Sequence, residues 1–130
     1  MNDFLKSMTV SSSGMSAQSA RLRITAENIS NADTPGYRRK IVPFEQMIDR
    51  KTGAQVVRTG RMSLDQAELE RIYDPSHPMA SVDGYYDGSN VNMLVEVADS
   101  REAQRSYEAN LKVFDQSRKM ATSLLDLLRR

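Results

Sequence analysis

The stretch ITAENISNADTPGYRRK, residues 24–40, decides the architecture that the sequence predicts. Apolar residues recur in it at helical spacing, and Asn28 and Asn31 share one helical face because they lie three residues apart. Lys or Glu would serve solubility equally well at these positions, whereas an amide can both donate and accept hydrogen bonds. The two asparagines therefore indicate either local capping of the last helical turn or hydrogen bonds to another chain.

The helical pattern stops at the four residues Thr34, Pro35, Gly36 and Tyr37. A residue that precedes proline is driven out of the helical region, so we expect the helix to end at Thr34. Pro35 and Gly36 fit the two central positions of a type II turn, which requires a positive φ at the second. Tyr37 is then expected to pack back on the preceding turn.

Residues 1 to about 34 are predicted to form one long helix, because a stripe with alternating spacings of three and four continues for about four heptads. The stripe consists of Leu5, Met8, Ser12, Met15, Ser19, Leu22, Ala26 and Ile29. Beyond Leu5, large and small residues alternate in it, and the small ones would allow a partner helix to approach closely. The serine-rich run 9–14 has low helix propensity, so we expect this part to fray until something packs on it.

A second long helix is predicted from about residue 90 to residue 130, with Asn90 or Asn92 as its N-cap. Glu96 and Asp99 lie near the positive end of its dipole, and two arginines lie at the other end. Its stripe consists of Met93, Val97, Ser100, Gln104, Tyr107, Leu111, Phe114, Ala121, Leu124 and Leu128. Asn110 on this helix raises the same question as the two asparagines of the first.

The middle of the chain, residues 37–88, is predicted to be a small β-rich and irregular module. Strand-like segments occur at residues 40–44 and 55–59, with a weaker one near 69–73, and Thr52-Gly53, Gly60, Asp74-Pro75 and Asp83-Gly84 are turn signals between them. Pro43 is typical of an edge strand. Residues 63–71 fit either a strand or one or two helical turns.

The fold class is therefore mainly α with a small β-rich middle, divided into residues 1–36 plus 89–130 and residues 37–88. An isolated two-helix hairpin is marginal, since ordering a backbone costs about 1–2 kcal/mol per residue and the serines and the alanine of the first stripe contribute little apolar burial. Either the helices fold back on the middle module, or they wait for neighbouring chains. Their length relative to that module favours neighbouring chains.

Composition excludes several classes of protein. The chain of 130 residues contains no cysteine, so disulfides and thiolate metal sites are excluded. Eighteen basic and seventeen acidic residues leave a charge of +1, which gives no indication of nucleic-acid binding. No apolar run is long enough to span a membrane, and residues 11–14 interrupt any secretory signal, so we expect no membrane span and no cleavable leader.

Two candidate sites have a structural interpretation and a functional one. His77, the only histidine, lies in the loop Asp74-Pro75-Ser76-His77-Pro78, where a rigid turn is a better explanation than a metal site without a second histidine. The basic residues 38–40 favour a solvated face or an acidic protein partner over phosphate binding. No catalytic motif is present, so we expect neither enzymatic activity nor a cofactor.

Taken together, these residues resemble the rod, hook and hook-filament axial proteins of bacterial flagella. The N-terminal signature of that family, Ala-x-Asn-Ile-x-Asn-x-x-Thr-Pro-Gly-Tyr, is similar to residues 26–37, and its C-terminal signature is similar to Asn90-Val91-Asn92 followed by Arg105, Tyr107 and Asn110. Within the family the likeness is closest to the proximal rod member, because of residues 73–78 (YDPSHP), Gly84-Tyr85 and the short middle region.

The resemblance implies a structural protein without a cofactor, whose terminal helices pair as an antiparallel coiled-coil hairpin. Many such hairpins pack into a hollow tube that crosses the periplasm and transmits torque from motor to hook. The implied partners are further copies of the chain, other rod proteins, the membrane-ring and export-gate end of the basal body, and the flagellar type III export apparatus, which exports the chain without a cleavable signal.

With this resemblance, the stripe of the first helix is expected to face its hairpin partner or a neighbouring chain, and Asn28 and Asn31 are expected to bond at that contact. The residues predicted to make the assembly contacts are Leu5, Met8, Met15, Leu22, Ala26, Asn28, Ile29, Asn31, Tyr107, Asn110, Leu111, Phe114, Leu124 and Leu128. Residues 34–37 are expected to turn the chain out of the tube wall. Two alternatives remain, namely another rod subunit of the same family and, from a different class, a soluble coiled-coil adaptor or secretion chaperone.

Overall fold

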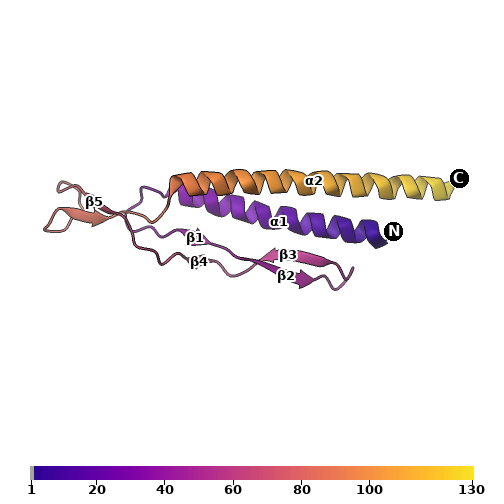
Figure 1. Cartoon of the computed structure of the whole chain (residues 1–130), viewed down its shortest axis with the longest axis horizontal. Coiled ribbons are helices and arrows are strands. Elements are labelled where there is room, and N and C mark those ends of the chain that lie inside the picture. Colours follow the sequence, from indigo (N-terminus) through magenta and orange to yellow (C-terminus); the bar gives the residue numbers. More distant parts are fainter. Residues whose placement is uncertain (1) are drawn as a thin grey trace.

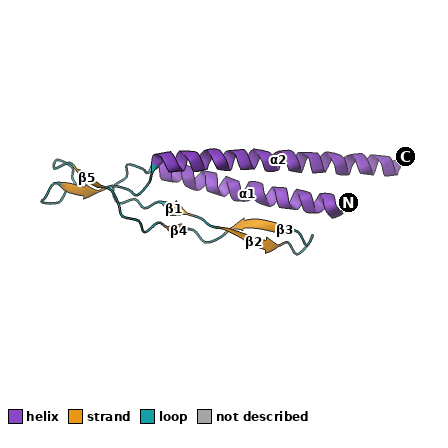
Figure 2. Ribbon diagram, viewed as in Figure 1, coloured by secondary structure: helices purple, strands orange, loops and turns teal. Residues whose placement is uncertain are grey.

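The computed structural model describes residues 2–130, so Met1, which falls within the predicted first helix, lies outside the described part of the chain. Two long helices lie side by side and antiparallel, with both chain ends at the same end of the molecule (Figure 1). A long β-hairpin runs beneath the first helix, and a second hairpin projects beyond the opposite end of the helices (Figure 2). The predicted helix–strand–helix order is thus confirmed.

Helix α1 spans Asn2–Ser30, four residues shorter than predicted. Asn31 explains the difference, because its Nδ2 donates to the carbonyl of Glu27 (2.9 Å) and its Oδ1 accepts a hydrogen bond from the Thr34 hydroxyl (3.1 Å). The side chain therefore caps the last turn and converts residues 31–36 into turns. The predicted turn follows, since the amide of Tyr37 bonds the carbonyl of Thr34 and Gly36 has a φ of 75°.

Helix α2 spans Met93–Arg129 and begins at the cap predicted for it. The side chain of Asn92 accepts hydrogen bonds from the amides of Leu94 (3.0 Å) and Val95 (3.4 Å), which satisfies two donors that the first turn leaves free. Asn90, the other candidate cap, instead accepts from the amide of Arg39 (2.6 Å) and donates to the carbonyls of Asp65 and Ala67. Asn90 therefore connects the start of α2 to the base of the long hairpin.

One long hairpin follows residues 39–65. Strands β1 (Lys40–Ile41) and β4 (Ser63–Leu64) pair on the side where α1 ends and α2 begins. Strands β2 (Phe44–Ile48) and β3 (Gln55–Thr59) pair further along the hairpin, toward its turn. The predicted strand at residues 55–59 is confirmed, whereas the one predicted at 40–44 is divided around Pro43. Residues 63–71 form no helix, since their first two residues form β4 and Arg71 begins the next strand. That next strand, at residues 71–73, confirms the weaker one predicted near residues 69–73.

The second hairpin consists of β5 (Arg71–Tyr73) and β6 (Tyr85–Asp87). Strand β6 was missed, because Tyr85-Tyr86 is short and follows a turn signal directly. Gly84 has a φ of 87°, and a side chain there would meet the ring of Tyr73. The amide of Gly36 bonds the carbonyls of Asp87 and Gly88, so the turn after α1 holds the base of this hairpin.

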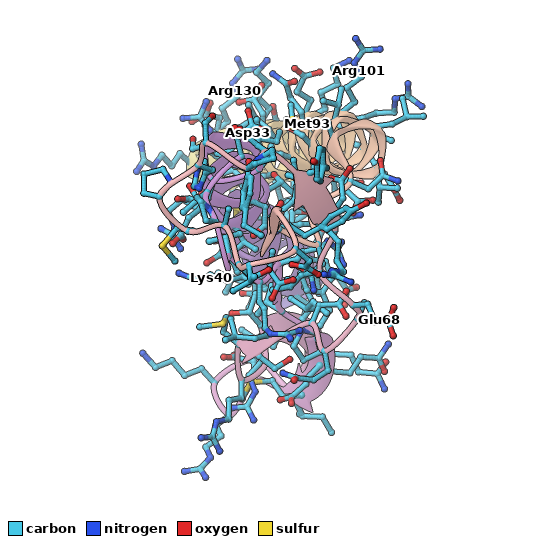
Figure 3. The ribbon with its side chains drawn as sticks, turned by 90° about the vertical axis from the view of Figure 1, so that its left-hand side faces the viewer. Asp33, Lys40, Glu68, Met93, Arg101 and Arg130 are labelled. Carbon is cyan, nitrogen blue, oxygen red and sulfur yellow. The ribbon has the colours of Figure 1, made fainter. Side chains whose placement is uncertain are left out.

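Helix α1 is the middle layer, between α2 and the long hairpin (Figure 3). On the hairpin side, the serine-rich run that was expected to fray meets β3, where the Ser13 hydroxyl accepts from the amide of Val57 (3.2 Å) and donates to the carbonyl of Val10 (2.7 Å). Small side chains thus allow a strand to lie against the helix. Neither helix, over the residues described, carries an apolar stretch of the length that a bilayer crossing needs.

The contact between α1 and α2 is made by small and polar residues at heptad spacing. Going along the pair, Asn28 contacts Glu96, Gly14 lies against Asn110, and Ser7 bonds Ser117 (2.8 Å). The buried residues of the two helices are Ser11, Ala17, Thr25, Asn28, Glu96, Ala103, Ser117 and Ala121. The large residues of both predicted stripes are not among them, so the seam within the chain is a different one from the stripe that the sequence suggested.

Gly14→Leu should separate the helices. A Cβ at position 14 would lie 2.7 Å from Asn110 Nδ2, and overpacking of this kind costs about 1–3 kcal/mol, which exceeds the roughly 1 kcal/mol that a helix gains by losing glycine. Urea unfolding of the purified chain measures the difference. Ser16→Leu, at an exposed position of the same helix, is the matched control, and equal stability of the two variants would contradict the close approach at Gly14.

Candidate assembly interface

Glu96 is the most buried ionisable residue at the junction of the two helices and the hairpin, with an exposure of 0%. Its carboxylate is paired with the guanidinium of Arg39, and it accepts a hydrogen bond from Asn28 Nδ2 (3.4 Å). A buried carboxylate that lacked such partners would cost several kcal/mol. Glu96 thereby fixes the start of α2, the end of α1 and the segment after the turn relative to one another.

Asn28 uses its whole amide inside the chain. Nδ2 donates to the carbonyl of Lys40 (3.0 Å) and to Glu96, while Oδ1 accepts from the amide of Lys40 (2.9 Å) and from the Tyr37 hydroxyl (2.7 Å). These four bonds leave no donor or acceptor for a neighbouring chain. The expectation that Asn28 bonds between chains is therefore corrected, and its bonds instead hold the returning backbone against α1.

Tyr37 packs back on α1 as predicted, and its hydroxyl contacts Asn28. Burial raises the pKa of this phenol above its ordinary value of 10, and the nearby carboxylates of Glu27 and Glu96 add to the effect, whereas Lys40 opposes it. The neutral phenol is therefore the form that the folded chain stabilises.

The basic residues 38–40 face acidic groups and carbonyls of the same chain. Arg38 donates to the carbonyls of Asp65 (3.1 Å) and Ala67 (3.0 Å), Arg39 meets Glu96, Asp99 (3.4 Å) and Asp65 (3.8 Å), and Lys40 pairs with Glu27. Burial lowers the pKa of Arg39, but the bond to Glu96 and the surrounding carboxylates outweigh it and raise the pKa. The predicted solvated face is therefore corrected to an internal ion-pair network.

The remaining predicted assembly residues lie at the surface or at its edge. Leu5, Ala26, Leu111 and Leu128 are exposed, and Met8, Met15, Leu22, Ile29, Asn31, Tyr107, Asn110, Phe114 and Leu124 are half-buried. Asn110 Nδ2 donates to the carbonyl of Ser106 (2.9 Å). Their role in contacts between chains stays a prediction, and their exposure leaves them available for it.

The loop 74–78 has the structural character that the sequence suggested. Asp74 Oδ1 accepts from the amide and hydroxyl of Ser76, and His77 Nδ1 accepts from the amide of Met79 (3.0 Å). The His77 ring stacks on Tyr86 with centroids 3.9 Å apart. Pro75 and Pro78 are exposed, and within residues 2–130 no three His, Asp or Glu side chains form a group that could hold a metal.

Sequence reasoning missed Glu96 and Arg39 as partners. The sequence pattern explained Glu96 only by its favourable position at the positive end of the helix dipole. Glu96 also lies seven residues before Ala103 and fourteen before Asn110, which places the three on one helical face. A search for small and polar residues at heptad spacing, in place of large apolar ones, would have placed all three on the inner face. The partner of Glu96 gives no local signal, because 57 residues separate it from Arg39.

Glu96→Gln should weaken the junction. The change removes the charge that Arg39 faces, and breaking a buried pair costs about 3–5 kcal/mol, which we reduce to roughly 2 kcal/mol because Arg39 is partly exposed. Thermal unfolding measures the loss. Glu102→Gln on the same helix, where the carboxylate is exposed and lies 3.5 Å from Arg21, should change stability by less than about 0.5 kcal/mol. Similar losses in the two variants would refute the role of Glu96.

Tyr37→Phe should lower stability by about 1 kcal/mol at neutral pH, since it removes the hydrogen bond to Asn28. Because the folded chain raises the pKa, the unfolded chain releases this proton first. The stabilisation is therefore complete below about pH 10 and is lost as the pH rises through the folded pKa. Urea unfolding between pH 8 and pH 11 should show a gap between wild type and variant that narrows at alkaline pH, whereas a constant gap would contradict the raised pKa.

Two family models match the chain, one at each end. Residues 8–38 match the flagella basal body rod protein model, and residues 82–127 match the model of the flagellar basal body rod FlgEFG protein C-terminal region. The first covers most of α1 and the turn after it, and the second covers β6 and nearly all of α2. Both matches therefore fall on the elements that build the junction around Glu96.

Full-length relatives give the same result. The chain is 44% identical over 127 residues to the flagellar basal-body rod protein FlgC of Agrobacterium fabrum, covering 92% of this chain and 91% of that protein. Identity to the protein of the same name from Salmonella typhimurium is 32% over 126 residues, covering 91% and 92%. With Bacillus subtilis FlgC it is 28% over 143 residues, covering 93% and 95%. The chain belongs to the FlgC family of flagellar basal-body rod proteins.

Proposed function

We propose that this chain is a structural subunit of the proximal rod of a bacterial flagellum. In this role it assembles by helical packing into the hollow shaft that transmits torque from motor to hook, and it requires no catalytic group. Membership of the FlgC family supports the proposal, because the related proteins carry the name of rod proteins of the basal body. The single observation that carries it structurally is the distribution of apolar side chains.

The helices bury small residues against each other and expose large ones. Along α2, Leu94, Leu111, Val113, Met120, Leu125, Leu127 and Leu128 are all exposed, and Leu128 is 73% exposed. Burying one such side chain contributes about 1.5–3 kcal/mol, which the isolated chain does not gain. At about 100° per residue these side chains point to more than one side of α2. Such a distribution suits contacts with several neighbours at once, as the wall of a tube provides.

Helix α2 continues beyond the N-terminal end of α1, so its last turns have no helix beside them (Figure 1). Four leucines, at positions 124, 125, 127 and 128, occupy this overhang. In the proposed assembly they contact neighbouring copies or other rod proteins. Stripe residues of α1 such as Ile29 and Met15 supply the opposing surface.

We further propose how the chain reaches the rod. A hairpin with a polar seam is easily unfolded, which suits passage through the flagellar type III export apparatus without a cleavable signal and assembly in the periplasm. Partners at the base of the rod then belong to the membrane-ring and export-gate end of the basal body. Coupled folding and assembly would bury the exposed side chains only after export.

Deletion of the encoding sequence tests the function directly. The deleted strain should be non-motile, and its purified basal bodies should lack a rod in electron micrographs, while the wild-type chain supplied in trans restores both. Motility without the chain would overturn the proposal.

Leu128→Asp should abolish motility without unfolding the chain. The side chain is already 73% exposed, so a charge there costs the isolated chain little, whereas a carboxylate buried in an assembly contact without a partner costs several kcal/mol. Ile29→Asp tests the α1 stripe at a half-buried position, so a thermal unfolding curve of this variant must accompany its motility assay. The controls Ser123→Asp and Ser30→Asp place the same charge at exposed neighbouring positions. Swimming assays and export of the variant into the periplasm separate failed assembly from failed secretion, and normal swimming of Leu128→Asp would exclude the overhang as a contact.

A further inference from the structure

The two hairpins of the chain carry opposite charge. Residues 68–87, here called the acidic hairpin, contain five carboxylates and one arginine, a net formal charge of −4 with His77 neutral. Residues 44–61, here called the basic hairpin, contain four basic and two acidic residues, a net formal charge of +2. The acidic hairpin projects beyond one end of the helices, and the turn of the basic hairpin lies toward the other end (Figure 1).

The charges of the acidic hairpin are available to a partner. Glu68, Glu70 and Asp87 are exposed, and none of the three makes an ion pair with another residue in the range 2–130. Glu68 projects outward from the ribbon in the view along the long axis (Figure 3). The loop between β5 and β6, at the tip of the same hairpin, presents apolar surface, since Met79 is 66% exposed and Val82 is fully exposed.

The basic hairpin has the complementary arrangement. Arg50, Lys51 and Arg61 are exposed and have no carboxylate partner among the described residues, whereas Arg58 is already paired with Glu45. On the same hairpin Ile48 is 63% exposed and Met47 is 40% exposed. Each hairpin thus combines exposed apolar side chains with free charges, and only the sign of the charge differs.

We propose that the acidic hairpin of one molecule docks on the basic hairpin of a second copy of this chain. An apolar centre with complementary charges around it is the usual composition of a specific protein contact. Because the two surfaces differ and lie toward opposite ends, the contact is heterologous and joins copies head to tail in an open series. This contact is separate from the exposed helix surface and adds a second, salt-sensitive connection to the proposed rod subunit.

Charge reversal in the full-length chain tests the contact. In one variant Arg50→Glu and Lys51→Glu make both hairpins acidic, and in another Glu68→Lys, Glu70→Lys and Asp87→Lys make both basic, because the acidic hairpin then carries a net formal charge of +2. A third variant combines all five changes and so restores opposite signs with the polarity exchanged, +2 on residues 68–87 and −2 on residues 44–61. Arg105→Glu with Lys112→Glu, at exposed positions of α2 away from both hairpins, is the control for net charge. Sedimentation velocity at 20 mM and 500 mM salt measures self-association. Salt should weaken a charged contact, because the Debye length falls from about 10 Å at 0.1 M ionic strength to about 3 Å at 1 M.

The wild type should self-associate at low salt and dissociate at high salt. Each hairpin variant alone should weaken association roughly tenfold, and an equimolar mixture of the two should recover it, as should the five-residue variant. Absence of salt-sensitive association in the wild type, loss in the control equal to that in the hairpin variants, or failure of the mixture to recover would each overturn the proposal. Since motility reports on the rod function separately, a negative result here leaves that function standing.

Discussion

The buried carboxylate of Glu96 is the constraint on which the arrangement depends. It lies where both helices and the long hairpin meet, and its charge is tolerable there only because Arg39 and Asn28 contact it. Those partners come from the turn segment and from α1, so the polar network forms only when the chain has already returned correctly from its first helix. The hydrogen bonds of Asn28 to both backbone groups of Lys40 then hold that segment in place. A short polar network therefore determines the architecture, in a molecule whose described residues include few buried apolar side chains.

The seam that leads away from this network is narrow and specific. Gly14 against Asn110 and Ser7 against Ser117 allow close approach of the helices. A shift of the register would break the hydrogen bond between the two serines and move Asn110 away from the space that Gly14 leaves. The cost of this close contact is that Leu, Met and Val side chains remain outside it. The same choice of residues thus explains both the close pairing within the chain and the apolar surface that the single chain leaves exposed.

Much of the fold could be predicted from the sequence, because its signals are local. Pro35 and Gly36 specify the turn, Asn92 specifies the start of α2, and the turn signals at Gly53 and Gly60 delimit β3. The end of α1 was misplaced by four residues because the amide of Asn31 competes for backbone groups before the proline acts. The sequence pattern predicted large apolar residues on the inner face of the helices, as in most protein cores. In this chain small and polar residues are the buried ones of both helices. The pairing of Arg39 with Glu96 joins residues far apart in the sequence, which no local pattern reveals.

The composition of the helix seam also governs how the chain responds to temperature. Unfolding exposes mostly serine, threonine, alanine and amide groups from the seam, and because polar exposure lowers the heat capacity while apolar exposure raises it, the net change per residue is small. The free energy of unfolding of a single molecule is consequently less curved with temperature. In the proposed assembly, the leucines and methionines would be buried on association, and the large heat-capacity change would accompany polymerisation. Cooling would then weaken the apolar contacts between subunits more than it weakens the subunit itself.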